Sequence, residues 1–248
     1  MAGKTETYKT IISKSARRLR DLTEIVISMA GFVPRSATFI RILLITASLV
    51  LSLYFNFYQP YNSECATLYF ILSETGYIGF IFLVLGKNGL RHWFIRRWRD
   101  EKKGYRAYET LLGFLFFHNG SSIAFLASSS PETFFPTNER GILLIIIPVI
   151  FSLGVLIKIW AAKVVTIDIY YWKDMFLGRK ICDFVVTGPY KYFSNPMYGI
   201  GQLPAYASAI WYGSKAGLIA AILNQALIFL FYFLVEKKFI NRIYLADK

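Results

Sequence analysis

The residue types best suited to chemistry are concentrated between Gly188 and Gln202, in the stretch GPYKYFSNPMYGIGQ. This stretch lies directly before an apolar run, where a membrane helix would ordinarily contain leucines. Its early Gly-Pro pair predicts a turn, and Pro196 suits the first turn of a helix with Asn195 as the N-cap. The free N–H groups and positive dipole end of such a helix suit a carboxylate ligand. Gly199 and Gly201 would let that ligand approach closely.

Acidic and aromatic residues are also found on either side of this stretch. The preceding residues, from Trp160 onwards, interleave aromatic side chains with Asp168 and Asp174, which is unusual for a simple connecting loop. Glu236 directly follows the apolar run 216–235, so it lies at the end of a predicted helix. A carboxylate at the C-terminal end of a helix opposes the helix dipole, which favours a functional role for Glu236. A solvated glutamate at the helix end is the ordinary alternative.

The elements that position these groups are predicted to be membrane helices. The chain has 248 residues, of which 55% are hydrophobic and 22 are phenylalanine, more apolar surface than a soluble domain of this length could bury. Windows of about 20 apolar residues can cross the hydrocarbon core. We find six such windows, at roughly Phe39–Tyr58, Ala66–Gly86, Thr110–Ser128, Gly141–Ala162, Met197–Tyr212 and Ala216–Val235.

The predicted fold is therefore an all-α integral membrane protein with about six transmembrane helices, the last two forming a short helical hairpin. We expect one domain over residues 1–248, with a basic segment 1–38, four spans within 39–162, and a loop, hairpin and tail in 163–248. Apolar residues at helical spacing in 10–33, among them Ile12, Leu19, Leu22, Val26 and Met29, predict an amphipathic helix in the membrane interface.

The distribution of positive charge predicts the orientation. The net charge is +13, and lysine and arginine number seven in residues 1–38, eight in 87–109, five in 163–195 and four in 236–248. The opposite connections contain two. By the positive-inside rule both termini and the two large loops are expected in the cytoplasm, and the basic segments indicate anionic lipid rather than nucleic acid as their partner.

Several polar residues fall within the predicted spans. Glu74 lies near the middle of the second window, and His118 and Asn119 lie near the middle of the third. Such residues mark a polar cavity or a partner, or they make interhelical hydrogen bonds without chemistry, and both interpretations stay open. No metal site is predicted, because neither Cys65 nor Cys182 has a second ligand at a metal-binding spacing.

The C-terminal part of the chain resembles a known family. The motif GPYKYFSNPMYGIG, followed by a helical hairpin and FYFLVEKKFINRIY, is similar to the phospholipid methyltransferases, and specifically to the phosphatidylethanolamine N-methyltransferases. The resemblance covers about residues 155–244. The wider group includes the isoprenylcysteine carboxyl methyltransferases, in which Arg-His stands where this chain has Ser194–Asn195. Ala161–Lys163 occupies the region where mammalian-type members carry Gly-x-Gly.

The resemblance implies an enzyme that takes S-adenosyl-L-methionine from the cytosol and a phospholipid from a bacterial inner membrane or an endoplasmic reticulum. It implies N-methylation of phosphatidylethanolamine, or also of its mono- and dimethyl forms, at the cytoplasmic leaflet. Glu236 and Tyr198 are the expected catalytic residues. The expected cofactor-binding residues are Gly188, Tyr190, Tyr192, Asn195, Pro196, Met197, Gly199, Gly201, Gln202, Glu236 and Lys237. The expected substrate-binding residues are Asp168, Tyr171, Trp172 and Asp174.

Two alternatives remain at the level of the sequence. Carboxyl methylation of an isoprenylated cysteine belongs to the same wider group. A non-catalytic membrane scaffold or a small transporter belongs to another class, and it would use Glu74, His118 and Asn119. Nothing in the sequence indicates an oligomeric state.

Overall fold

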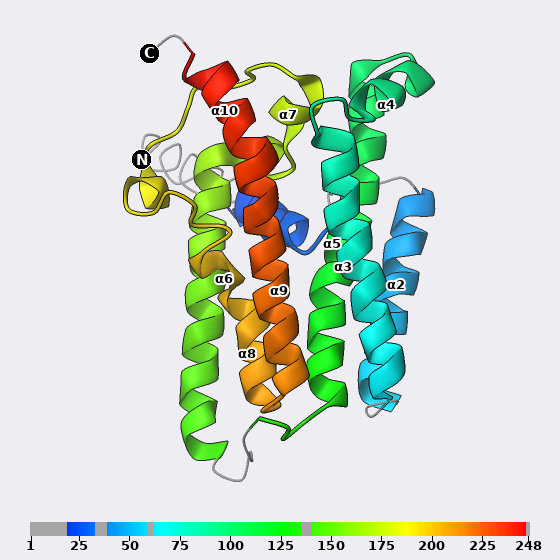
Figure 1. Cartoon of the computed structure of the whole chain (residues 1–248), viewed down its shortest axis with the longest axis vertical. Helices are drawn as coiled ribbons and strands as arrows, with labels where there is room; N and C mark the ends of the chain where they lie inside the picture. The colour runs from blue at the N-terminus through cyan, green and yellow to red at the C-terminus, as the bar shows by residue number, and fades with distance from the viewer. Residues whose placement is uncertain (1–18, 33–38, 59–61, 135–139, 247–248) are drawn as a thin grey trace, which may run out of the picture.

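The computed structural model of the chain describes residues 19–32, 39–58, 62–134 and 140–246. Over these residues the fold is a bundle of roughly aligned helices without strands, which confirms the predicted all-α class (Figure 1). The main helices of the bundle are α2 (Phe39–Tyr58), α3 (Ser63–Leu85), α5 (Glu101–Ser129), α6 (Arg140–Tyr170), α8 (Leu203–Trp211) and α9 (Lys215–Phe231).

Shorter elements connect these helices. Three of them, α4 (Arg91–Trp98), α7 (Lys173–Leu177) and α10 (Lys237–Tyr244), gather at one end of the bundle, which we call the α7/α10 end (Figure 1). The others are 3₁₀ turns at Gly188–Lys191 and Ile200–Gln202 and a π-helical turn at Tyr232–Glu236. This π-turn joins α9 to α10 without a break, so residues 215–244 form one long helix (Figure 1).

Several helices begin at residues that the sequence marks as N-caps. The Asn62 side chain accepts a hydrogen bond from the Cys65 backbone N–H at 3.1 Å, which starts α3. Asp100 accepts one from the Lys103 N–H at 2.7 Å and starts α5. Such caps satisfy N–H groups that have no partner within the helix. Because of its cap, α5 begins at Glu101, earlier than the apolar window alone predicts.

Within the described residues, four helices are long and apolar enough to cross a membrane, at Ser63–Leu85, Glu101–Ser129, Gly141–Leu177 and Lys215–Tyr244, and Ile42–Tyr54 is a shorter apolar helix. The predicted span Met197–Tyr212 is wrong as a full crossing. Its continuous helix, α8, has nine residues, or about 14 Å at 1.5 Å per residue. Residues 196–202 form turns, so the predicted helix beginning at Pro196 is also wrong, and α8 begins at Leu203.

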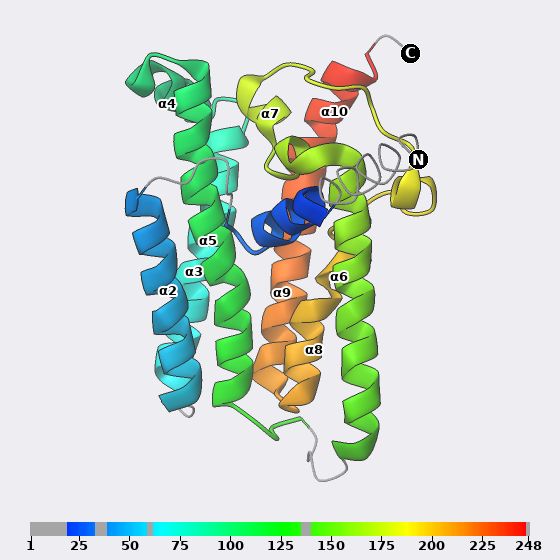
Figure 2. The same ribbon diagram turned by 180° about the vertical axis from the view of Figure 1, so that it is seen from behind.

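Helix α6 extends beyond the predicted end of its span. It continues from Ala162 to Tyr170, with one non-helical residue, Thr166, at φ 71°. That break turns the last residues of α6 across the α7/α10 end of the bundle, where α7 follows (Figure 2). Further along the bundle, Gly154 lets α6 contact α8, because a Cβ atom there would lie 2.4 Å from Pro204 Cδ.

The N-terminal amphipathic segment is helical over residues 19–29, while its predicted residue Ile12 lies outside the described part. This helix crosses the bundle at an angle between α5 and α6 (Figure 2). On the predicted apolar face, Leu19 and Val26 are 67% and 47% exposed, whereas Met29 packs against the core. Ile25, on another face of the helix, also joins the core, and Tyr171 Oη donates a hydrogen bond to the Ser28 carbonyl oxygen at 2.6 Å.

The polar residues inside the bundle make interhelical hydrogen bonds. Asn119 Nδ2 donates to Glu74 Oε2 at 2.7 Å. Asn224 Nδ2 lies 3.0 Å from the same oxygen and 2.8 Å from Asn119 Oδ1. All three residues are buried, and they join α3, α5 and α9. His118 Nδ1 lies 2.6 Å from Tyr69 Oη, which adds a second bridge between α3 and α5.

This cluster yields a prediction about stability. Replacing Asn224 by leucine leaves the Glu74 carboxyl group short of one donor in an apolar surrounding, so we expect the free energy of unfolding to fall by about 1–2 kcal/mol. Thermal unfolding in detergent measures the effect. Leu223→Ala, on the exposed side of the same helix, is the control and should change stability less. Equal stability of Asn224→Leu and the wild type would contradict a stabilising role.

Candidate active site

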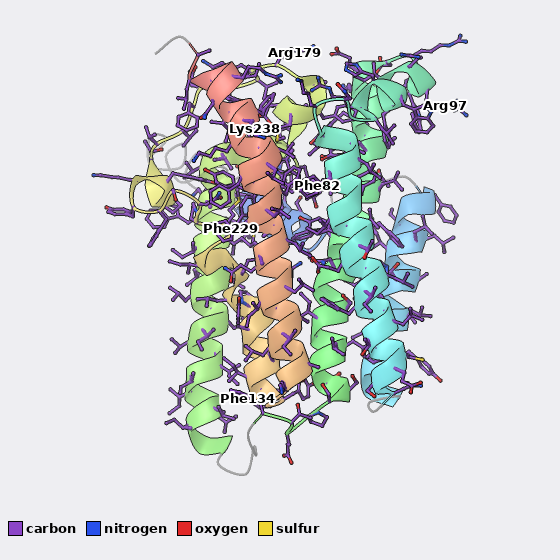
Figure 3. The ribbon with its side chains drawn as sticks, in the orientation of Figure 1. Phe82, Arg97, Phe134, Arg179, Phe229 and Lys238 are labelled. Atoms are coloured by element: carbon purple, nitrogen blue, oxygen red, sulfur yellow. The ribbon has the colours of Figure 1, made fainter. Side chains whose placement is uncertain are left out.

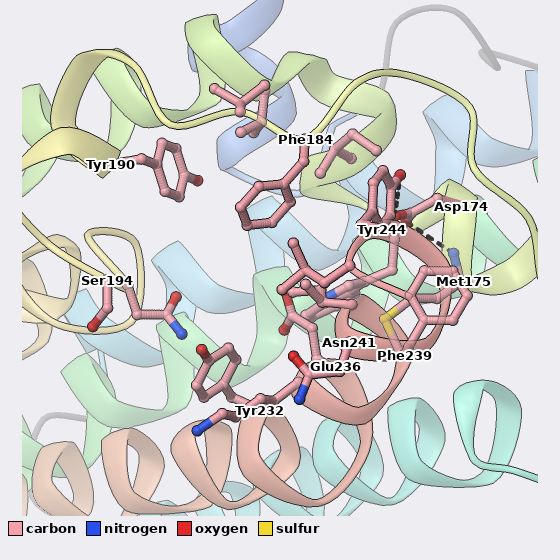
Figure 4. Close-up of a pocket in the computed structure, with 18 of the residues that line it drawn as sticks. Asp174, Met175, Phe184, Tyr190, Ser194, Tyr232, Glu236, Phe239, Asn241 and Tyr244 are labelled. Atoms are coloured by element: carbon pink, nitrogen blue, oxygen red, sulfur yellow. Dashed lines mark hydrogen bonds between the residues drawn. The ribbon is translucent and has the colours of Figure 1, made fainter. Parts of the chain in front are cut away.

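A cavity of about 310 Å³ lies at the α7/α10 end of the bundle. It is bounded by α7, by the loop 182–198 and by the continuous helix that runs through the π-turn into α10 (Figure 4). Its aromatic lining consists of Trp172, Phe184, Tyr190, Tyr198, Tyr232, Phe239 and Tyr244. Its polar lining includes Asp174, Asp183, Ser194, Asn195, Glu236 and Asn241. The mixture of many rings with a few converging polar groups is typical of a small-molecule site.

One hydrogen bond joins the two segments that the sequence analysis singled out. Tyr198 Oη donates to Glu236 Oε2 at 2.7 Å, although the residues are 38 positions apart. Tyr198 is 8% exposed and Glu236 is half-buried. The turn that follows Pro196 and the π-turn of the last long helix therefore meet at this cavity.

The local backbone explains how both side chains reach the cavity. Glu236 is the last residue of the π-turn Tyr232–Glu236, and the extra residue in such a turn shifts the direction in which the following side chains point. On the other side, Gln225 of α9 donates from Nε2 to the Tyr198 carbonyl oxygen at 2.9 Å and to the Gly199 carbonyl oxygen at 3.2 Å. Tyr206 Oη in turn donates to Gln225 Oε1 at 2.5 Å. Gln225 therefore holds the Tyr198 turn against α9.

Asp174 closes the opposite side of the cavity. It is 6% exposed, and its oxygens accept hydrogen bonds from Tyr244 Oη at 2.9 Å and from the Met175 N–H at 2.8 Å (Figure 4). The first of these bonds fastens α10 to α7. Trp172, just before α7, has φ 52° and points its ring into the same cavity.

One polar group that lines the cavity has no protein partner. Asn195 Nδ2 is buried and makes no hydrogen bond with any of the described residues. The predicted N-cap role of Asn195 is therefore wrong for its side chain, since no helix begins there and no N–H bonds to it. A buried donor without a partner is costly, and a ligand with an acceptor oxygen would satisfy it.

The structure brings part of the predicted site together in this cavity. Its lining includes eight of the residues singled out from the sequence, namely Trp172, Asp174, Tyr190, Asn195, Met197, Tyr198, Glu236 and Lys237. Burial raises the pKa of Tyr190, so its phenol stays neutral and presents an uncharged ring to the cavity.

Other predicted residues lie elsewhere. Asp168 forms an ion pair with Lys173 at 2.9 Å and faces a different hollow, beside Glu101 and Arg179. Tyr171 bonds to Ser28, and Tyr192 is 68% exposed. The remaining predicted residues outside the cavity lining are Gly188, Pro196, Gly199, Gly201 and Gln202. These glycines serve backbone packing: a Cβ atom at Gly188, where φ is 61°, would lie 2.7 Å from Val164 Cγ2.

Sequence reasoning missed several residues of the site. Tyr232 precedes Glu236 by four positions, so helical spacing could have placed both on one face. Tyr244 and Asn241 follow on α10, beyond the predicted span. Gln225 lies within an apolar window and carries no local signal for its contact with the Tyr198 turn.

Comparison with known proteins finds similarity to one family over the C-terminal part of the chain. Residues 142–247 match the family described as phospholipid methyltransferase. A phosphatidylethanolamine N-methyltransferase of Eremothecium gossypii is 34% identical over 96 residues, which is 39% of this chain and 11% of the relative. A phosphatidylethanolamine N-methyltransferase of Kluyveromyces lactis is 35% identical over 102 residues, 41% of this chain and 12% of the relative.

The chain thus spans only about an eighth of the length of these curated relatives. No solved structure matches the chain. The whole lining of the cavity, from Val165 to Leu245, falls within the matched residues. The site thus lies within the part of the chain, residues 142–247, that is similar to the phospholipid methyltransferase family.

Proposed function

We propose that the protein transfers methyl groups from S-adenosyl-L-methionine to the amine of phosphatidylethanolamine. The observation that carries the proposal is the hydrogen-bonded pair Tyr198–Glu236 inside an aromatic cavity at the end of a membrane bundle. A site there can receive a water-soluble donor from the aqueous side and a lipid amine from the bilayer. The names of the two curated relatives support this choice of acceptor.

The cavity has features that suit the proposed donor. Its volume of about 310 Å³ lies at the lower end of the range of about 300–1,000 Å³ for ligand pockets. The unpartnered Asn195 amide N–H would bind the carboxylate of the methionine part. The rings of Tyr190, Tyr232 and Trp172 would face the sulfonium, each contributing roughly 0.5–2 kcal/mol. When bound, the donor supplies an electrophilic methyl group.

Glu236 is the group that can act as the base. Phosphatidylethanolamine carries an ammonium group in water, and its nitrogen can attack only after it loses a proton. Glu236 would accept that proton, and Tyr198 would hold the carboxylate in place through its 2.7 Å hydrogen bond. The π-turn and Gln225 fix the two side chains, so that they need little rearrangement when the reactants align.

The proposed orientation places the α7/α10 end in the cytoplasm. Basic residues of α4, α7 and α10 lie at this end, including Arg91, Arg96, Lys173 and Arg242. By the positive-inside rule they face the cytoplasm, where S-adenosyl-L-methionine is made available to the site. The acceptor would then come from the cytoplasmic leaflet.

The primary test follows the methyl group. Membranes that contain the protein, supplied with methyl-labelled S-adenosyl-L-methionine, should produce label in mono-, di- or trimethylated ethanolamine lipid. Glu236→Gln should lower this rate by about 10²–10⁴-fold, because the amide cannot take the proton. Glu64→Gln, an exposed change in α3, is the control. Label released by mild alkali as methanol would indicate a carboxyl methyl ester and contradict N-methylation.

Tyr198→Phe tests the second member of the pair. It keeps the ring but removes the donor to Glu236, so we expect turnover to fall about 10- to 100-fold while the affinity for S-adenosyl-L-methionine changes little. Steady-state kinetics of the purified enzyme in lipid nanodiscs measure both quantities. Tyr192→Phe, in the same loop but 68% exposed, should behave as the wild type. Unchanged turnover of Tyr198→Phe would remove Tyr198 from the mechanism.

Asn195→Ala tests the donor site. The side chain makes no internal hydrogen bond with the described residues, so its loss should not unfold the protein. The dissociation constant for S-adenosyl-L-methionine should rise roughly tenfold, the effect of one lost hydrogen bond to a charged group. Titration calorimetry checks this, and the Michaelis constant for the lipid should stay constant. An equal loss of both affinities would point to structural damage instead.

A further inference from the structure

A second hollow lies on the side of the bundle, between α5 and α6. It encloses about 390 Å³ and is separate from the candidate active site in its lining. Helix α8 and the turn Ile200–Gln202 form its floor, and residues 29–30 of the N-terminal helix border it (Figure 2). Phe151, at its edge, is 50% exposed, so the hollow opens sideways from the bundle. We call it the lateral groove.

A small cavity of about 30 Å³ lies between the lateral groove and the candidate active site and shares lining residues with both. It shares Lys158, Gln202, Tyr77 and Phe116 with the groove. It shares Trp172, Met197 and Tyr198 with the active-site cavity. The side chains of Trp172, Met197 and Tyr198 thus lie between the small cavity and the active-site cavity.

Lys158 supplies a positive charge to the lining of both the small cavity and the lateral groove. It lies on α6, eight residues before the break at Thr166, or about 12 Å along the axis. The Nζ atom of Lys158 lies over the Phe116 ring, 5.6 Å from its centroid. A Cβ atom at Gly201 would lie 3.4 Å from Lys158 Cγ, so the turn Ile200–Gln202 packs against this lysine. No carboxylate of the described residues pairs with it.

An unpaired cation at this depth needs an anion. Charged side chains inside a membrane are costly and mark the path or site of a ligand. Two amides in the groove lining, Asn119 and Asn224, already donate hydrogen bonds to the carboxylate of Glu74. Gln202 accompanies Lys158 in both hollows and adds an amide donor.

We propose that the lateral groove and the small cavity bind the acceptor phospholipid, with its phosphate on Lys158 and Gln202. The lipid enters sideways from the bilayer between α5 and α6, and its acyl chains stay in the groove and the surrounding lipid. The amine is directed past Met197 toward Tyr198 and Glu236. This last step rests on the proposed function, whereas binding of the phosphate does not.

The surroundings of the groove favour a membrane lipid over a soluble phosphate ester. The groove walls include Phe117, Ile123 and Ala124, and the outer face of α6 is apolar and exposed at Val149 and Leu153. A free phosphate compound would have to cross that apolar surface. A phospholipid already lies against it with its headgroup near the α7/α10 end.

A binding assay tests the phosphate site independently of catalysis. Nanodiscs of phosphatidylcholine contain either a photoactivatable phosphatidylethanolamine or a photoactivatable diacylglycerol, which lacks the phosphate. Lys158→Met should reduce crosslinking of the first lipid about tenfold and leave the second unchanged, while Lys158→Arg keeps most of the labelling. The control is Lys163→Met, an exposed lysine of the same helix. Equal labelling of Lys158→Met and the wild type, or equal loss in Lys158→Met and Lys158→Arg, would overturn the assignment.

Kinetics of the same variants separate the two proposals. Lys158→Met should raise the Michaelis constant for phosphatidylethanolamine about tenfold, without changing the affinity for S-adenosyl-L-methionine. If the wild type methylates lipid and Lys158→Met shows no rise, the lipid site is wrong and the proposed function stands. If no variant methylates lipid but crosslinking still depends on Lys158, the proposed function is wrong and the lipid site stands.

A second variant tests the route without changing any charge. Gly120 lies on α5 in the groove, and a Cβ atom there meets nothing within 4 Å. Gly120→Leu should therefore fill the groove without straining the fold, and it should reduce phosphatidylethanolamine crosslinking severalfold. Gly79→Leu on α3, which has equally open space but lies outside the groove, is the matched control. Full labelling of Gly120→Leu would exclude entry through this groove.

Discussion

The hydrogen bond from Tyr198 to Glu236 joins two segments that are 38 residues apart, and the candidate site forms around it. One partner follows a turn of the polar loop, and the other ends a π-turn in the last long helix. Tyr198 is buried and Glu236 is half-buried. In such surroundings a carboxylate or phenol without a partner would be costly. Their mutual satisfaction therefore brings the loop against the helix and leaves the cavity between them.

A second layer of contacts supports this pair from both sides. Gln225 binds the carbonyl groups of Tyr198 and Gly199, and the Asp174–Tyr244 hydrogen bond fastens α10 to α7. In these contacts the donors and acceptors are already hydrogen-bonded within the protein. Their role is therefore to position neighbouring residues rather than to bind a ligand. The Asn195 amide, which faces the cavity unpartnered, is the contrasting case. Positioning groups and binding groups can thus be told apart by whether the protein itself satisfies them.

Polar residues inside the bundle have a similar division of roles. Glu74, Asn119 and Asn224 satisfy one another across α3, α5 and α9, which favours a stabilising role over transport. Lys158 lines two neighbouring hollows, and no carboxylate of the described residues forms an ion pair with it. In an apolar medium a satisfied cluster holds helices together, whereas an unsatisfied charge needs a ligand.

The sequence by itself determined the fold class, most of the membrane helices and the two segments that form the site. Apolar windows and chemical motifs are local properties, so Glu236, Tyr198 and Asn195 could be singled out without coordinates. Tertiary structure alone decided that Asp168 and Tyr171 lie outside the cavity, that Met197–Tyr212 does not cross as a helix, and that Gln225 and Lys158 point inward. Those outcomes depend on non-local features: the break at Thr166, the π-turn at Tyr232–Glu236, and the close approach of α6 to the Gly201 turn. Such features depend on how helices pack, because hydropathy and spacing record which face of a segment is apolar but not which segment that face meets.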